Sequence, residues 1–165
     1  MRKWWWLLLI IPIILVWQAA ALYQDTLSSE KDLQAKAIAK AKQAVDDLTV
    51  TDVEHYYGNQ PYQVVYGTSN KESIYVWVPM NKKGKVITKK ASEGWTKKRV
   101  KEHVMNEREP LNIIDIRLGM ESGTPLWEVT YRDQQQRYTY YYLDFQSGEL
   151  LKRYSLKTKG LKEEQ

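Results

Sequence analysis

The stretch from Arg2 to Tyr23, RKWWWLLLIIPIILVWQAAALY, constrains this chain more than any other, because it is long and apolar enough to span a membrane. Two cations are followed by about 20 uncharged residues, and a helix of that length is roughly 30 Å long, which matches the hydrocarbon core of a bilayer. Pro12 is tolerated in a spanning helix. Cations beside a span stay in the cytoplasm, so residues 1–23 are predicted to form a cytoplasmic tip and transmembrane anchor, with the body extracytoplasmic.

Two interpretations of this segment remain open. Trp4, Trp5 and Trp6 stand at one end and Trp17 near the other, where amphipathic rings prefer the headgroup layer. The alternative is a cleaved signal peptide, with the alanines at 19–21 as the cleavage site. Hydrophobic length and aromatic spacing favour the uncleaved single-pass anchor in the cell membrane. Both interpretations place the body outside the cytoplasm.

Composition excludes several classes of site. The 165 residues include no cysteine, so disulfides, a lipid-modified cysteine, thiolate catalysis and cysteine-based zinc sites are absent. The formal net charge of +5 falls to +3 when Arg2 and Lys3 are set aside. That excess is mild and acidic residues are interspersed throughout, so we expect no nucleic-acid partner.

Residues 24–90 are predicted to form a first module of one helix and four strands. A helical stripe consists of Leu33, Ala37, Ala41, Val45 and Leu48. Because much of the stripe is alanine, the helix should lie close against a sheet. Strand-like runs follow at residues 53–57, 62–66, 73–78 and 85–88, separated by turns.

Residues 91–157 repeat this order and are predicted to form a second module. Thr96 is a candidate cap for a helix near residues 97–108. Four strand-like runs follow, and in the first of them Ile114, Ile116 and Leu118 are expected to share one face. An offset of about 64 residues superposes three pairs: Gly84 on Gly148, Trp77 on Tyr141, and Val65 on Val129.

Together the two modules predict an α+β fold in which each module packs one helix on a curled antiparallel sheet of about four strands. The polar tail over residues 158–165, with its alternating charges, is expected to be frayed.

The segment from Leu118 to Leu151, LGMESGTPLWEVTYRDQQQRYTYYYLDFQSGELL, carries the most specific pattern in the chain. A strand with the run Trp-Glu-Val is followed by a hairpin of the form D-x-x-[TS]-G-E-L, as in PepSY-type modules. Together with the anchor and the preceding IYVWVP and EGWTKK, the chain resembles the YpmB/TseB-like family of Gram-positive bacteria. The resemblance implies two tandem cystatin-like PepSY modules. It is weaker in the first module, where no Trp-Glu-Val run precedes the hairpin.

The same resemblance implies a non-enzymatic role without a cofactor. Members of the family are associated with cell-wall elongation, acting on or beside a class B penicillin-binding protein, and the chain is expected to bind and modulate such a partner. Two alternatives remain open. One is a PepSY-type inhibitor or chaperone of an extracytoplasmic peptidase, and the other is a module that binds wall polymer through tyrosines and lysines. Lysine runs such as 97–101 also suit weak contact with an anionic wall polymer.

The acidic motif residues are expected to be structural, so no catalytic residue is predicted. Glu128 should lie on the solvent side or pair across strands, with Arg132, Arg137 or Arg153 as partner. Asp144 and Glu149 bracket a tight hairpin, in which Asp144 bonds the turn backbone and Gly148 adopts a positive φ. This explains the carboxylates better than a glycosidase pair does.

His55 and His103 are predicted to be surface residues, because no third ligand is spaced to complete a metal site with them.

Tyrosine supplies the candidate partner surface. The chain has 12 tyrosines, and several occur in runs, where neighbouring strand residues face opposite ways. Some must therefore lie on the outer face of a sheet. Tyrosine anchors protein interfaces and stacks on sugars, although exposed sheet tyrosines are also common. The candidates are Tyr56, Tyr57, Tyr140 and Tyr142.

Overall fold

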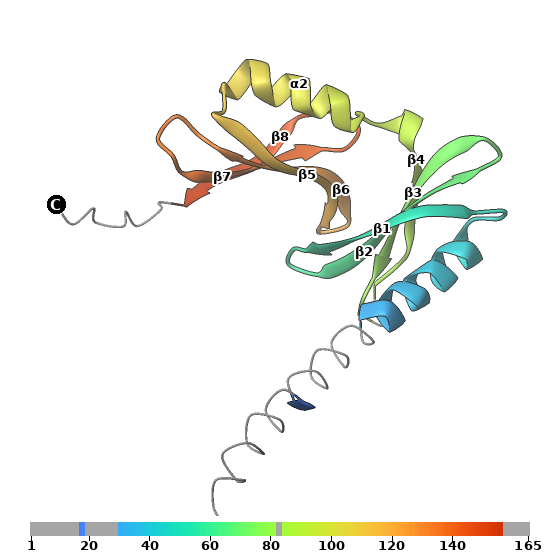
Figure 1. Cartoon of the computed structure of the whole chain (residues 1–165). Helices are drawn as coiled ribbons and strands as arrows, with labels where there is room; N and C mark the ends of the chain where they lie inside the picture. Colours follow the sequence, from blue (N-terminus) through green and yellow to red (C-terminus); the bar gives the residue numbers. More distant parts are fainter. Residues whose placement is uncertain (1–16, 19–29, 82–83, 157–165) are drawn as a thin grey trace, which may run out of the picture. The chain divides into compact units, whose positions relative to one another are not determined.

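The structure is a computed structural model that describes residues 17–18, 30–81 and 84–156 (Figure 1). It confirms an α+β fold with two antiparallel four-stranded sheets. The predicted anchor over residues 1–23, except residues 17–18, and the predicted tail over 158–165 lie outside the described residues. Within the described ranges, no helix combines the length and the apolar character that a membrane span requires.

The first sheet follows a helix over residues 30–44. Its strands lie in sequence order: β1 (Thr49–Tyr57), β2 (Pro61–Ser69), β3 (Glu72–Pro79) and β4 (Ile87–Lys90). Ala37 and Ala41 are buried against Val65 and Val76, as the alanine stripe predicts. Small side chains let a helix approach a sheet closely, and β-branched residues supply the complementary surface.

The second sheet repeats this arrangement after a short 3₁₀ helix, η1 (Ala91–Glu93), and the helix α2 (Lys97–Arg108). Thr96 caps α2, since its side-chain oxygen accepts a hydrogen bond from the Arg99 amide at 3.2 Å. The strands are again in sequence order: β5 (Asn112–Glu121), β6 (Thr124–Arg132), β7 (Tyr138–Asp144) and β8 (Leu150–Leu156). The predicted bounds of α2 are confirmed.

The repeat extends to the irregularities of the strands. The pairing of β1 with β2 shifts between Val50 and Asp52, and that of β5 with β6 shifts between Ile113 and Asp115. The second bulge corrects one prediction, because Ile114 does not share a face with Ile116 and Leu118. It is 46 % exposed, and Ile113 packs on the core instead. A bulge inserts one residue and exchanges the faces beyond it.

The match of Trp77 with Tyr141 is also corrected by one residue. In the first sheet Val64 pairs with Trp77, and in the second Glu128 pairs with Tyr142. Residues of β2 and β6 therefore correspond at an offset of 64, but those of β3 and β7 at 65. The connection between β6 and β7 is longer than the one between β2 and β3, which accounts for the shift.

One apolar core joins the two sheets. Trp77 lies 5.7 Å from Phe145, measured between ring centroids, and Tyr56 approaches Gly119 of β5 so closely that an added Cβ would clash with its ring. The described residues from 37 onward form one compact unit that contains both sheets. The predicted boundary between modules at residues 90 and 91 stays a prediction.

Candidate functional site

Four tyrosines gather on the face of the second sheet that is opposite α2. Tyr141 and Val129 face α2, which lies across the sheet in Figure 1, so their neighbours Tyr140 and Tyr142 face the other way. Tyr154 of β8 stacks on both, at centroid distances of 5.0 Å from Tyr140 and 5.8 Å from Tyr142. We call Tyr56, Tyr140, Tyr142 and Tyr154 the tyrosine cluster.

Tyr56 joins this cluster from the first sheet. Glycine at position 119 leaves the surface of β5 open, and the Tyr56 ring occupies that space. The side chain is 1 % exposed, and burial raises the pKa of its hydroxyl, an effect increased by the charge of Glu128. Tyr56 therefore stays neutral and holds the end of β1 against the second sheet.

The Tyr142 hydroxyl lies at the centre of the cluster. It is 2.9 Å from the Tyr154 hydroxyl, and the Lys152 ammonium lies 4.3 Å from the centroid of the Tyr142 ring. Burial raises the pKa of Tyr142, and its hydrogen bonds with Tyr154 and Glu128 raise it further. The phenol therefore remains protonated at neutral pH.

An ion pair lies beneath the tyrosines. Glu128 is 3 % exposed, and its carboxylate accepts a hydrogen bond from Arg117 Nε at 2.9 Å across the β5–β6 pair. Burial, the largest single influence, lowers the pKa of Arg117, but the hydrogen bond to Glu128 and the negative charges of Glu128 and Asp115 together raise it above its ordinary value. Glu128 therefore pairs across strands, which was one of our two alternatives. The solvent-side alternative is wrong, because both faces of β6 are covered, and the partner is Arg117, which was not among the three predicted arginines.

A second ion pair borders the cluster between Lys152 of β8 and Glu121 of β5. Both side chains are partly exposed, in contrast to Glu128. The tyrosine cluster therefore has charged groups at its margin as well as below it. This combination of aromatic surface and adjacent charge can bind either a protein or a glycan.

The structure brings together three of the four predicted tyrosines. Tyr56 and Tyr142 are buried, Tyr140 is half-buried, and Tyr57 lies elsewhere, 71 % exposed and stacked on His55 at 4.1 Å. Sequence reasoning missed Tyr154, which is 45 % exposed. Pairing the two predicted strands about the turn at Gly148 would have placed it opposite Tyr140. The surface through which this protein contacts a partner therefore stays a prediction.

The remaining candidates have structural partners. Asp144 accepts hydrogen bonds from the amides of Gln146 at 2.9 Å and Ser147 at 2.7 Å, and Gly148 has a φ of 73°, which confirms the hairpin interpretation. Among residues 17–18, 30–81 and 84–156, no three His, Asp or Glu side chains are grouped as metal ligands.

Both histidines are half-buried, so they are less exposed than the prediction of surface residues implies. His55 Nε2 lies 2.8 Å from the Met80 sulfur, and the His103 ring packs at 5.1 Å against Trp95.

Comparison with known proteins identifies relatives that match most of the chain. Residues 34–79 match the model of the cell wall elongation regulator TseB-like domain. The chain is 34 % identical over 135 residues to a probable cell wall elongation regulator TseB of Bacillus subtilis, covering 81 % of this chain and 84 % of that protein. It is also similar to the structure of the YpmB protein from Bacillus subtilis, with a TM-score of 0.70 and 36 % identity. That similarity covers 74 % of this chain and 96 % of the solved one.

Proposed function

This chain belongs to the family of TseB-like cell wall elongation regulators, and we propose that it is a membrane-anchored extracytoplasmic protein that binds and modulates a class B penicillin-binding protein. The family description supports a regulatory role in wall elongation and a partner within that machinery. The identity of the partner, attachment to the membrane and the side on which the body lies are our proposal.

The N-terminal segment supports the proposed location. About 20 uncharged residues follow Arg2 and Lys3, with tryptophans toward both ends. An anchor would confine the protein and a membrane-bound partner to two dimensions. Their effective concentration would then be high enough for a modest interface to suffice.

The observation that carries the proposed binding role is the exposed apolar edge next to the tyrosine cluster. No described strand pairs with the outer edge of β8. This strand exposes Leu150, Leu151 and Leu156 as well as Tyr154, each by 45 % or more. Edge strands with exposed apolar residues are sites of strand addition and protein docking. We define the β8 edge as these four residues.

A non-enzymatic mechanism fits the chemistry of this region. The carboxylate of Glu128 is engaged by Arg117, and that of Asp144 by the backbone of its own turn. Because these carboxylates are held within the fold, we expect the protein to act by binding, which would change the position or conformation of its partner. The partner would carry out the wall chemistry.

A photocrosslinking amino acid placed at Tyr154 of the full-length chain in cells tests the proposal. We expect a covalent product with a class B penicillin-binding protein, identified by mass spectrometry. The matched control places the same amino acid at Met105 of α2, which is 44 % exposed and lies outside the β8 edge.

A product at Tyr154 but not at Met105 supports the proposed interface. Capture of only an extracytoplasmic peptidase at Tyr154 would replace the proposal with the inhibitor alternative. Equal products at both positions would show that proximity in the membrane, and no defined interface, causes the crosslink.

A further inference from the structure

A polar cleft opens on the α2 side of the second sheet, opposite the tyrosine cluster. Its volume is about 360 Å³, and it lies between the end of α2, the β6–β7 hairpin and β8. Charged side chains from all three elements line it: Glu107, Arg108, Asp133, Arg137 and Arg153. The cleft therefore lies where three elements that are distant in sequence converge.

The acidic side chains of the cleft are already engaged. Asp133 pairs with Arg137 at 2.7 Å and also accepts hydrogen bonds from the Arg137 and Gln135 amides. The hydrogen bond from the Arg137 side chain is the main reason that the pKa of Asp133 is lowered. The Glu107 carboxylate oxygen Oε2 lies 3.6 Å from Nε2 of His103. These two carboxylates therefore have their own cationic or polar neighbours within the fold.

Two arginines of the cleft have no such compensation. Arg108 lies over the Tyr141 ring, 5.5 Å from its centroid, and Arg153 is the direct cross-strand neighbour of Tyr141. Neither forms an ion pair with a carboxylate in the described part of the chain. Because Tyr141 contacts Arg108 of α2 and pairs with Arg153 of β8, both arginines line one cleft, and neither guanidinium group donates a hydrogen bond to another described residue.

Hydroxyl groups line the floor beside these arginines. The hydroxyl of Thr139, which is 1 % exposed, lies 2.7 Å from the hydroxyl of Ser155. Gln134 and Gln135 from the hairpin add amide donors and acceptors at the rim. Such groups hydrogen-bond to the hydroxyls of a sugar or polyol.

We propose that this cleft binds an anionic oxygen group, phosphate or carboxylate, carried on a hydroxylated chain. Guanidinium groups recognise both anions through paired N–H donors, and the cleft offers two that have no ionic partner among the described residues. The cleft carries three arginines and two acidic residues, so its formal net charge is positive by one. A ligand group with a single negative charge would neutralise it. The inference does not rest on the proposed protein partner, because the cleft uses Arg153 and Ser155 of β8, whereas the proposed interface uses the residues of the β8 edge.

The experiment is a calorimetric titration of the full-length chain in detergent with two probes. One probe is glycerophosphoglycerol, which is a phosphodiester, and the other is trigalacturonate, which carries carboxylates. We expect saturable binding of at least one probe with a dissociation constant of about 1 mM. Binding should weaken as salt is added, because charge attraction contributes to it. The preferred probe identifies the anionic group.

The variants Arg153→Gln and Arg108→Gln should each weaken binding by roughly tenfold, because each removes one charged donor pair. The control Lys101→Gln removes the same charge from an exposed residue of α2 that does not line the cleft, and it should bind like the parent. Two arginine variants are tested so that, if one of them does not fold, the other still tests the proposal. Absence of saturable binding by both probes, or unchanged binding in both folded arginine variants, would overturn the proposal.

Discussion

At the residue scale, Glu128 is the clearest difference between the two repeats. It occupies the position that Val64 occupies in the first sheet, and Tyr142 stands where Trp77 stands. An apolar pair in one repeat is therefore a carboxylate–phenol pair in the other. The buried carboxylate needs Arg117, since an unpaired buried charge is strongly unfavourable.

Replacing Arg117 by methionine is expected to lower the free energy of unfolding by about 3 kcal/mol, the low end for a broken buried pair, because Arg117 itself is partly exposed. The double variant Arg117→Met/Glu128→Leu should recover most of that loss, because no buried charge remains. Urea denaturation of both variants measures the two values. If the double variant is as unstable as the single one, the loss is due to packing and the ion pair is not its cause.

Burial was the part of the candidate site that could not be predicted at this scale. Strand alternation correctly placed Tyr140 and Tyr142 on the face opposite Tyr141. It could not show that Tyr56 of the first sheet would reach that face across Gly119. The alternation of residues along one strand shows only which side chains face each side of its own sheet. It does not show which surface of the other repeat packs against that side.

At the scale of elements, local chemistry determined what could be predicted. The Thr96 cap sufficed to locate α2, on which Val100 and Val104 are buried. The bulge near Ile114 could not be predicted, because the apolar residues at 113, 114 and 116 allow either register. Turns with Gly148 were predictable, since a positive φ has a chemical signature.

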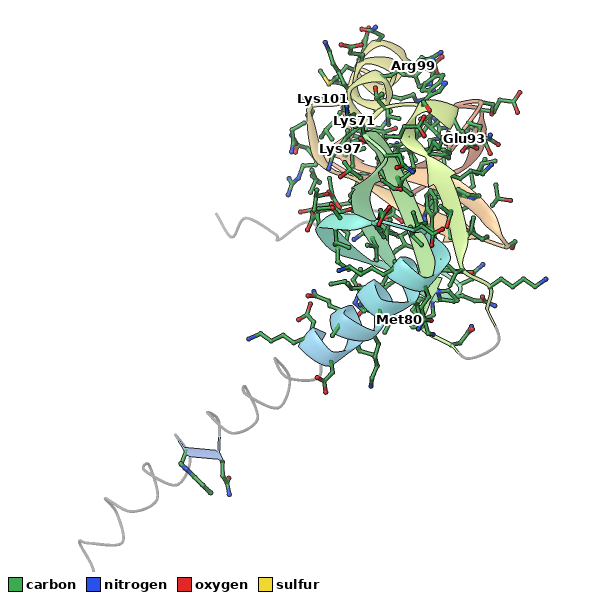
Figure 2. All side chains as sticks on the ribbon, turned by 90° about the vertical axis from the view of Figure 1, so that its right-hand side faces the viewer. Lys71, Met80, Glu93, Lys97, Arg99 and Lys101 are labelled. Carbon is green, nitrogen blue, oxygen red and sulfur yellow. The ribbon has the colours of Figure 1, made fainter. Side chains whose placement is uncertain are left out.

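The first turn of α2 carries positive side chains at the positive end of the helix dipole, which is unfavourable. Lys97, Lys98 and Arg99 stand there without an acidic residue, and Figure 2 shows Lys97 and Arg99 on this helix together with Lys101. The positive end of a helix favours anions, so the variant Lys97→Glu should stabilise the protein by about 0.3–1 kcal/mol at low salt.

Thermal unfolding of the Lys97→Glu variant, compared with Lys101→Glu in the second turn, tests this effect. The gain should be larger at position 97 and should shrink as salt is added, because the effect acts on the first turn and is screened. Equal gains at both positions would instead indicate a general reduction of the positive net charge.

At the scale of the whole molecule, the repeats are coupled through their apolar core. Each sheet has its own helix on one face, and the opposite face of the first sheet supplies Tyr56 and Trp77 to a core shared with the second. Neither repeat buries these aromatic residues alone. A sequence repeat predicts two similar folds, but only the structure identifies the faces on which they meet.

The N-terminal segment determines where this molecule can act, and its two interpretations make different predictions about the mature chain. An uncleaved anchor predicts that the protein in cells keeps residues 1–23 and stays in the membrane fraction after an alkaline wash, because about 20 apolar residues remain in the bilayer. A cleaved signal peptide predicts a chain that begins near residue 22 and is released. Intact mass spectrometry of both fractions distinguishes them, and residues 24–165 fused to a cleavable signal provide the released control. Recovery of the shortened chain in the soluble fraction would contradict the anchor, and a regulator of a membrane-bound partner would then have to bind it tightly enough without tethering.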